Sequence, residues 1–265
     1  MPHNRIKAAL REGRAVTGSV IEESRSVGTV KMMAVAGHDF VWLDTEHSMH
    51  DWETLLTLVQ FSLACDVVPL IRVTDLSYPL VARALDTGAL GVIIPRVETR
   101  DEVERAVSYA KYPPLGRRGA GGRARLAYEP RDVRSGIEEA NAETMVIVQV
   151  ETPQAVANLD AIAAVPGLDV VCIGPTDLTI NLGIPGQGEH PMFLAAIEEI
   201  VTSCRRHGIA VGMVGREAAA FRRWHEMGIR FLVCSSDGSM IAQGATRDVQ
   251  VLREIIQPTP PTPAS

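Results

Sequence analysis

Charged and imidazole side chains follow the apolar runs of this 265-residue sequence at regular intervals. His47 ends the polar segment 44–47 after one run, and Arg72 directly follows the next. Glu151 and Asp177 come after two later runs, and each of these two pairs is separated by about one strand–helix repeat. If the runs are neighbouring parallel strands, the four side chains meet at the carboxyl end of one sheet.

Two carboxylates on adjacent strands favour a divalent metal site. The oxygens of Glu151 and Asp177 suit Mg²⁺ or Mn²⁺, with Co²⁺ as a less expected ion, because such ions often take one or two protein carboxylates and keep positions for water and substrate. Either residue alone is also compatible with a role at a helix N-terminus, where acidic side chains gather. Their pairing near His47 and Arg72 favours the metal site.

Two further side chains have the chemistry of a catalytic centre. His47 closely follows Asp44 and Glu46, and a neighbouring carboxylate raises the basicity that a general base needs. The alternative is a loop histidine that bonds to the backbone. Arg72 suits a carboxylate, phosphate or enolate oxygen, and the alternative for it is a structural salt bridge across the barrel.

The segment Gly174-Pro175-Thr176-Asp177 turns a strand into a helical segment. The backbone N–H groups of Thr176 and Asp177 are candidates for binding a substrate carboxylate, and an ordinary capped turn is the alternative. Asp86 lies in a predicted helix and, from its position alone, is a solvated carboxylate.

Eight apolar, β-branched runs alternate with amphipathic stretches, which is the pattern of a parallel sheet buried on both faces. The predicted strands are 16–20, 40–43, 67–71, 91–94, 145–150, 170–173, 210–214 and 231–234. The predicted helices lie near 28–36, 51–63, 77–87, 100–111, 153–164, 192–206, 216–227 and 238–256. The sequence therefore predicts an α/β protein, a single (β/α)8 barrel of the TIM type.

This barrel is expected to occupy residues 1–257, and the proline-rich segment 258–265 is expected to be a loose tail. The interval between Ile94 and Met145 is about twice the usual repeat and contains a glycine- and arginine-rich loop within 112–144. Loops of this length in compact domains are usually functional or disordered.

Composition narrows the classes of function. The net charge of −6 argues against nucleic-acid binding, and no apolar run approaches the ~20 residues of a membrane helix. No secretory signal is expected, and the four cysteines lack zinc-site spacing, so we expect a cytoplasmic protein. Lysine occurs only at positions 7, 31 and 111, which disfavours Schiff-base chemistry.

Five motifs in order resemble the HpcH/HpaI aldolase family. They are Asp44-x-Glu46-His47, Arg72, Tyr112-Pro-Pro-x-Gly-x-Arg-Gly, Gln149-x-Glu151-Thr152 and Gly174-Pro175-x-Asp177-Leu178. The resemblance covers about residues 5–255. Within the family, the motifs are similar to those of class II 4-hydroxy-2-oxo-heptanedioate aldolases and related 2-keto-3-deoxy-sugar-acid aldolases.

The resemblance implies a role for each matched residue. His47 would accept a proton, with Asp44 orienting it and Asp86 keeping it basic. Arg72 would stabilise the developing enolate. Glu151 and Asp177 would bind the metal, and Gln149 and Thr176 would contact the substrate. A hexamer, a dimer of trimers with the last helix swapped between subunits, is also implied.

We therefore expect a metal-dependent pyruvate aldolase that reversibly cleaves a 4-hydroxy-2-oxo acid to an aldehyde and pyruvate, or a close 2-oxo acid. One alternative is a CoA-ester lyase or a decarboxylating carbon–carbon synthase with the same enolate chemistry. A sugar-phosphate isomerase is a second, if Gly215 and the segment Ser235–Gly238 form a phosphate site. A third alternative is a non-catalytic barrel that serves as a binding or scaffold protein.

Overall fold

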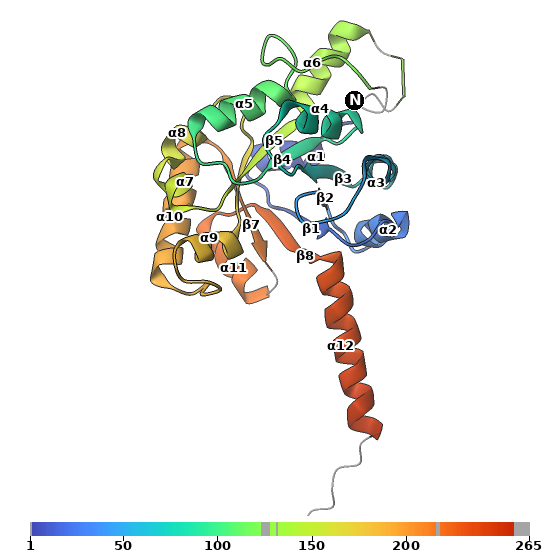
Figure 1. Ribbon diagram of the computed structural model, residues 1–265, viewed down its shortest axis with the longest axis vertical. Helices are drawn as coiled ribbons and strands as arrows, with labels where there is room; N and C mark the ends of the chain where they lie inside the picture. Colours follow the sequence, from blue (N-terminus) through green and yellow to red (C-terminus); the bar gives the residue numbers. More distant parts are fainter. Residues whose placement is uncertain (1, 123–127, 131, 216–217, 257–265) are drawn as a thin grey trace, which may run out of the picture.

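Eight parallel strands close into a barrel in chain order, with β1 paired to β8 (Figure 1). The computed structural model describes residues 2–122, 128–130, 132–215 and 218–256. The strands are β1 (Val16–Ile21), β2 (Phe40–Asp44), β3 (Val68–Arg72), β4 (Gly91–Ile94), β5 (Met145–Val150), β6 (Val170–Ile173), β7 (Ala210–Gly215) and β8 (Phe231–Ser236). All eight predicted strands are confirmed, and the predicted TIM-type barrel with them.

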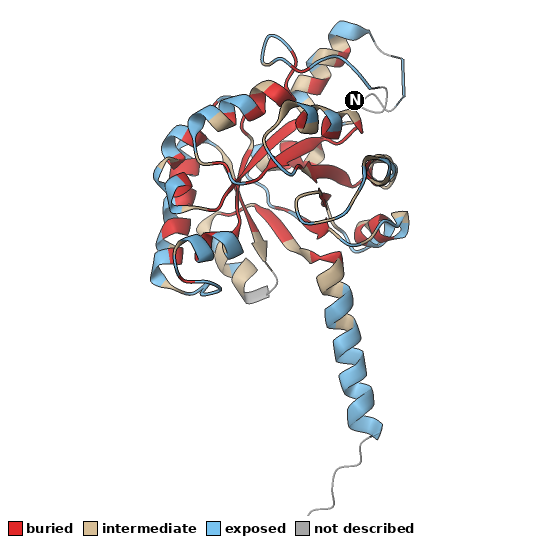
Figure 2. Cartoon of the chain, in the orientation of Figure 1, coloured by how far each residue is buried: buried red, intermediate tan, exposed pale blue. Residues whose placement is uncertain are grey.

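The strands are mostly apolar and mostly buried, because both of their faces are covered (Figure 2). Inside the barrel, Phe40 and Phe231 stack with their ring centroids 4.3 Å apart, and Trp42 and Leu70 belong to the same buried cluster. A second, larger cluster fills the layer between the strands and the surrounding helices. The strand ends are thereby held in fixed positions around the barrel mouth.

Helices surround the sheet, and their positions follow the prediction closely. They are α1 (Arg5–Arg11), α2 (Val27–Val35), α3 (Trp52–Ala64), α4 (Tyr78–Asp86), α5 (Arg100–Ala110), α6 (Val133–Glu143), α7 (Pro153–Ala157), α8 (Leu159–Ala163), α9 (Pro175–Asn181), α10 (Pro191–His207), α11 (Ala218–Met227) and α12 (Asp237–Ile256). Asp51 caps α3 and Thr152 caps α7, each through a bond to a backbone N–H of the first turn.

Three helical features differ from the prediction. The single helix expected over 153–164 is two short helices that meet at Asn158. Helix α1 was not predicted, although Asn4 caps it and Ile6 and Ala9 are buried. Helix α6 lies inside the segment expected to be a loop, 112–144, and buries only Gly136 and Ala140.

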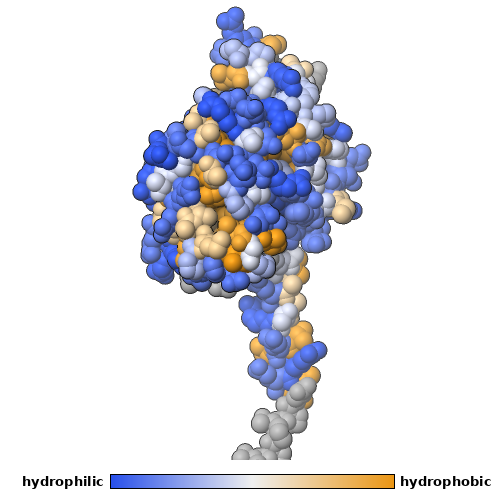
Figure 3. All heavy atoms as spheres, turned by 60° about the vertical axis from the view of Figure 1, so that its left-hand side comes forward, coloured by the Kyte–Doolittle hydropathy of each residue, from blue (hydrophilic) through white to orange (hydrophobic). Residues whose placement is uncertain are grey.

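Helix α12 projects away from the barrel (Figure 1). Its apolar side chains Ile241, Val249, Leu252 and Ile256 are exposed and lie at helical spacing, and Figure 3 shows apolar side chains among the polar ones along this helix. The predicted tail 258–265 lies outside the described residues. Of the helices described here, none is both long enough and apolar enough to cross a bilayer.

Candidate active site

A cavity of about 370 Å³ opens at the carboxyl ends of the strands. Eight of the ten predicted site residues line it, together with several neighbours, and Asp44 and Asp86 do not belong to its described lining. The described lining consists of Val20, Glu22, Trp42, His47, Arg72, Gln149, Glu151, Gly174, Pro175, Thr176, Asp177, Val214, Ser235 and Ser236. The structure thus brings the side chains from the ends of β2, β3, β5 and β6 to one place.

Asp44 and Arg72 form a two-pronged ion pair at the ends of adjacent strands. They face each other in the β2–β3 register, and Asp44 Oδ1 and Oδ2 accept from Arg72 Nε and Nη2, both at 2.7 Å. Burial of Asp44 opposes ionisation, but the hydrogen bonds and charge of Arg72 outweigh it and lower the pKa of this carboxyl. The guanidinium is therefore held in one orientation.

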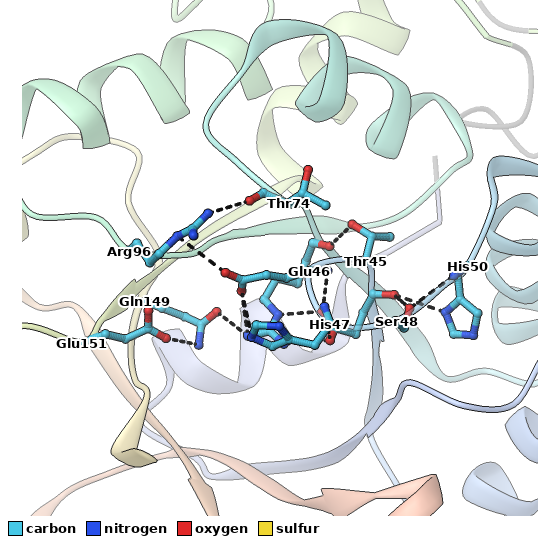
Figure 4. Close-up of polar contacts among 11 residues, drawn as sticks. Thr45, Glu46, His47, Ser48, His50, Thr74, Arg96, Gln149 and Glu151 are labelled. Carbon is cyan, nitrogen blue, oxygen red and sulfur yellow. Dashed lines mark hydrogen bonds and ion pairs between the residues drawn. The ribbon is translucent and has the colours of Figure 1, made fainter. Parts of the chain in front are cut away.

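The remaining nitrogen of Arg72 extends this network to Gln149, whose side chain lies beside that of Glu151 in Figure 4. Arg72 Nη1 donates to Gln149 Oε1 at 3.2 Å and lies 3.0 Å from Glu46 Oε2. The guanidinium carbon also lies 5.2 Å from the ring centroid of Trp42. Gln149 in turn donates from Nε2 to Glu151 Oε1 at 2.8 Å, so the arginine and the candidate metal ligand are linked through one amide.

Glu151 is a buried carboxylate near other carboxylates. Glu151 is only 4% exposed, and this burial raises the pKa of its carboxyl group to about 7. The negative charges of Asp177 and Glu46 raise the pKa further. Asp177 lies in the first turn of α9 and lines the same cavity. Three acidic groups that repel one another in a cavity have the electrostatics of a cation site.

These residues fit a divalent cation that is only partly coordinated by protein. Glu151 and Asp177 supply hard oxygen atoms, and in the described part of the chain no cluster of three or more His, Cys, Asp or Glu side chains has metal-binding geometry. Mg²⁺ commonly binds through one or two carboxylates and fills its other positions with water and substrate. The two predicted ligands are therefore suited to a site that a chelating substrate completes.

Gly174 is required next to this carboxylate. A Cβ built at position 174 would collide with Oε1 and Cγ of Glu151. We predict that Gly174→Ala displaces Glu151 and lowers affinity for Mg²⁺ or Mn²⁺ about tenfold or more. Calorimetric metal titration measures this loss, and Gly188→Ala, at a position where a Cβ meets nothing within 4 Å, is the control. Unchanged affinity in Gly174→Ala would contradict the assigned ligand.

His47 is positioned differently from the expectation. Asp44 accepts the backbone N–H of His47 at 3.2 Å and does not bond its imidazole, so it orients the loop and Arg72. The carboxylate near the ring is Glu46, with 3.9 Å between His47 Nε2 and Glu46 Oε2. The imidazole is 66% exposed and lines the cavity, where a substrate hydroxyl has access to it.

Asp86 does not belong to the described lining of the cavity. It ends α4, and its Oδ1 accepts from Arg118 Nη2 at 2.8 Å. The Arg118 side chain is 1% exposed and lies over the ring of Tyr112. Within one chain the described contacts of Asp86 therefore hold the loop after α5, and its expected influence on His47 stays a prediction.

Two side chains of the site were not assigned a role from the sequence. Glu46 contacts Arg72, His47 and, at 3.6 Å, Arg96 Nε, and it is 9% exposed. Its place in the polar segment before His47 was the available signal. Trp42 was read as a strand residue, but its Nε1 is buried without a hydrogen-bond partner in the described structure, and its ring lies under Arg72.

None of the three lysines lines this cavity. Lys7 and Lys111 line a different cavity, and Lys31 is exposed on α2. A Schiff base with a substrate carbonyl needs an amine within the active-site cavity. The placement of the lysines therefore agrees with the prediction that the reaction does not use one.

The phosphate site that the isomerase alternative requires near β7 and β8 is not favoured. Asp237, inside this segment, is a carboxylate that accepts the backbone N–H groups of Glu22 at 3.0 Å and Ser24 at 2.8 Å, and its charge would repel a phosphate. Ser236 Oγ donates to Glu22 Oε1 at 2.6 Å, so a second carboxylate lies there. At Gly215, a Cβ would collide with Trp224, which leaves little space for an anion.

Known proteins match this chain over most of its length. The sequence model of the family described as HpcH/HpaI aldolase/citrate lyase matches residues 23–243. The chain is 34% identical to 4-hydroxy-2-oxo-heptane-1,7-dioate aldolase of Salmonella dublin over 242 residues, which are 91% of this chain and 92% of that protein.

Two solved structures extend the comparison. The HpcH/HpaI aldolase from Desulfitobacterium hafniense DCB-2 has a TM-score of 0.92 and 32% identity, covering 96% of this chain and 99% of that one. The citrate synthase SbnG has a TM-score of 0.85 and 29% identity, covering 94% and 97%. On the family match and the identity over most of its length, the chain belongs to the HpcH/HpaI aldolase/citrate lyase family.

Proposed function

We propose that the protein is a class II aldolase that reversibly cleaves a 4-hydroxy-2-oxo acid to an aldehyde and pyruvate, or a close 2-oxo acid. The observation that carries the proposal is the convergence of Glu151, Asp177 and Arg72 on one cavity that no lysine lines. The curated relative named as a 4-hydroxy-2-oxo-heptane-1,7-dioate aldolase supports the same reaction.

Each side chain of the cavity has a task in this reaction. A divalent cation between Glu151 and Asp177, for which we propose Mg²⁺ or Mn²⁺, would polarise the keto group as a Lewis acid. His47 accepts the proton of the C4 hydroxyl as the C3–C4 bond breaks and the aldehyde leaves. Arg72 donates to the enolate oxygen that develops on the remaining three-carbon fragment.

The substrate carboxylate needs a second set of donors. The backbone N–H groups of Thr176 and Asp177, in the first turn of α9 after Gly174 and Pro175, remain the predicted partners. Gln149 bridges Arg72 and Glu151, and so keeps the enolate donor and the metal ligand at a fixed separation. These donors would orient the 2-oxo acid so that its C3–C4 bond lies near His47.

The metal dependence is tested by two reagents with opposite expected outcomes. Removal of divalent cations with EDTA should abolish retro-aldol activity, and Mg²⁺ or Mn²⁺ should restore it. Borohydride added with pyruvate should leave the enzyme active, because no imine forms to be reduced. Inactivation by borohydride, or full activity after chelation, would refute the proposed route.

A carbon–carbon synthase of the same family is the second candidate. The similarity to a protein named citrate synthase favours it, because citrate formation also adds an enolate-type carbon to a carbonyl compound. Proton exchange into the methyl group of pyruvate separates an enzyme that forms the pyruvate enolate from one that uses another nucleophile. Absence of both this exchange and the cleavage of 4-hydroxy-2-oxo acids would favour the synthase.

We further propose a cytoplasmic homo-oligomer, in line with the expected hexamer, in which α12 packs on a neighbouring subunit. The support is the apolar stripe Ile241, Val249, Leu252 and Ile256, which the barrel of its own chain leaves exposed. A helix whose apolar side chains face water gains stability when a second chain covers them.

Leu252→Asp is expected to weaken this association, because it places a charge in the stripe. Light scattering after size-exclusion chromatography should show a smaller particle than the wild type. Arg253→Asp, a charge change at the adjacent position of the same helix, is the matched control and should leave the mass unchanged. A monomeric wild-type protein would contradict the proposal.

A further inference from the structure

A second cavity lies at the opposite end of the barrel, below the starts of β5, β6 and β7. Its volume is about 390 Å³, and its described lining includes Met145 at the start of β5, Asp169 just before β6 and Ala210 at the start of β7. Helix α1 and the end of α5 complete the wall. This basal cavity shares none of its described lining residues with the catalytic cavity.

Three basic side chains and one acidic side chain line the basal cavity. Lys7 and Arg11 come from α1, and Lys111 is the C-cap of α5. Asp169 Oδ1 lies 3.2 Å from Lys7 Nζ and 4.0 Å from Arg11 Nη2, and its Oδ2 accepts the N–H of Val146 at 3.0 Å. Since the described lining holds no other acidic or basic group, positive charge exceeds negative charge when all three basic groups are protonated.

Lys111 is the basic group that has no direct ion pair among the described residues, although the charge of Asp169 acts on it from farther away. It is 4% exposed, and its Nζ donates to the carbonyl oxygens of Asn141 at 2.7 Å and Thr144 at 2.6 Å, with no ion pair in the described part of the chain. Lys7 Nζ donates to the same Thr144 oxygen at 2.8 Å. Burial, together with the charge of Lys7, lowers the pKa of Lys111 to about 7.

A buried ammonium group without a direct ion pair is unfavourable, and the one carboxylate of the cavity, Asp169, is already paired with Lys7 and Arg11. An anion in the cavity would supply the missing charge. The described wall also contains Leu10, Leu115 and Leu168, which offer apolar contact to an alkyl chain. Both properties together match a molecule with a charged end and a short apolar body.

We propose that the basal cavity is a second binding site, which takes a short-chain carboxylic acid with its carboxylate among Lys7, Arg11 and Lys111. The guanidinium of Arg11, which is 69% exposed, lies where it meets the carboxylate at the entrance. Inorganic phosphate shares the oxyanion chemistry, but it has no part that uses the apolar wall. The site is independent of the proposed aldolase reaction.

Binding at this site takes up a proton. Near pH 8 most of the Lys111 amine is neutral in the free protein, and a carboxylate beside it favours the ammonium form. Affinity should therefore decrease as the pH rises from 6.5 to 8.5, by about tenfold.

Isothermal titration of the metal-free full chain with hexanoate, hexanamide and inorganic phosphate tests the proposal. Hexanoate should bind once per chain, phosphate more weakly, and hexanamide not measurably. The titration is repeated at pH 8 in two buffers with different ionisation enthalpies. The difference between the two measured binding enthalpies should correspond to the uptake of nearly one proton per hexanoate bound. Equal binding of hexanamide, tighter binding of phosphate than of hexanoate, or an absence of proton uptake would overturn it.

Variants of the two cavities show which of them binds hexanoate. Lys111→Met and Arg11→Gln should each reduce hexanoate affinity by about tenfold or more, and Arg11 is exposed enough that its replacement leaves folding intact. Arg72→Lys, which alters the catalytic cavity, should bind hexanoate as the wild type does. Loss of binding in Arg72→Lys, with binding retained in Arg11→Gln, would assign the ligand to the catalytic cavity and overturn the proposal, whatever the outcome of the aldolase assays.

Discussion

Glu151→Gln is expected to lower kcat/KM for retro-aldol cleavage by about 1000-fold or more, because a Lewis acid contributes several kcal/mol to such a reaction. The amide keeps the size of the side chain and its contact with Gln149, so the cavity keeps its shape. What the variant loses is the negative charge that faces Asp177. Steady-state cleavage of a 4-hydroxy-2-oxo acid at saturating Mg²⁺ or Mn²⁺ measures the loss.

Glu98→Gln is the matched control, since Glu98 lies beside the end of β5 but outside the described lining of the cavity. It should retain most of the activity. A Glu151→Gln enzyme with more than about a tenth of wild-type activity would remove Glu151 from the metal site, because a lost ligand costs more than that.

Without metal, Glu151→Gln and the wild type are expected to differ in how their stability depends on pH. Because the pKa of Glu151 is raised from 4.5 to about 7 on folding, the wild type loses stability as the pH rises through this interval. Glu151→Gln lacks this titration and should be more stable than the metal-free wild type at pH 8, by about 3 kcal/mol at most. Below pH 4.5 the two should converge. Urea unfolding at the two pH values measures the difference.

Strand positions were predictable because the pattern of a doubly buried parallel strand is a continuous apolar run. The predicted β2 ended one residue short of Asp44. The predicted β3 began one residue before Val68 and ended one residue short of Arg72. A polar residue ends an apolar run in the sequence, but here the ladder continues. Asp44 and Arg72 satisfy each other across the strands, which the sequence does not reveal without the register.

The sequence predicts those parts of the site that lie directly at the carboxyl ends of strands. Glu151 and Asp177 follow β5 and β6, which are adjacent, so their convergence follows from the barrel alone. The partner of Arg72 does not follow in this way, because a guanidinium at a barrel mouth has several carboxylates within reach. The structure selects Asp44 and Glu46, and leaves the His47 imidazole near Glu46.

Contacts between segments that are distant in the chain could not be predicted from the sequence. Asp86 pairs with Arg118 across a separation of 32 residues, and neither side chain lies in a run whose pattern indicates the other. Lys7 and Lys111 were counted only as scarce lysines, since lysine is ordinarily exposed. Their burial at the base of the barrel depends on α1, a helix too short to give a clear apolar period.

Arg72→Ala is the second variant with a large expected effect, a loss of about 100-fold or more in kcat, as for removal of an oxyanion donor. The rate of proton exchange into pyruvate isolates this step, because enolate formation needs no aldehyde. Arg96→Ala is the matched control: Arg96 also contacts Glu46, but it is 61% exposed and lies outside the described lining of the cavity.

The interpretation of Arg72→Ala depends on Asp44, which is fully buried and loses its ion-pair partner. Such a loss destabilises a protein by about 3–5 kcal/mol, so reduced activity needs a test that separates unfolding from chemistry. Arg72→Lys provides it, because the ammonium still neutralises Asp44 but has too few N–H groups to keep both bonds to Asp44, the bond to Gln149 and a bond to the enolate. If Arg72→Lys is as stable as the wild type and slow in exchange, Arg72 acts on the enolate. If exchange in the folded variants falls less than about tenfold, Arg72 has only a structural role and another group must stabilise the enolate.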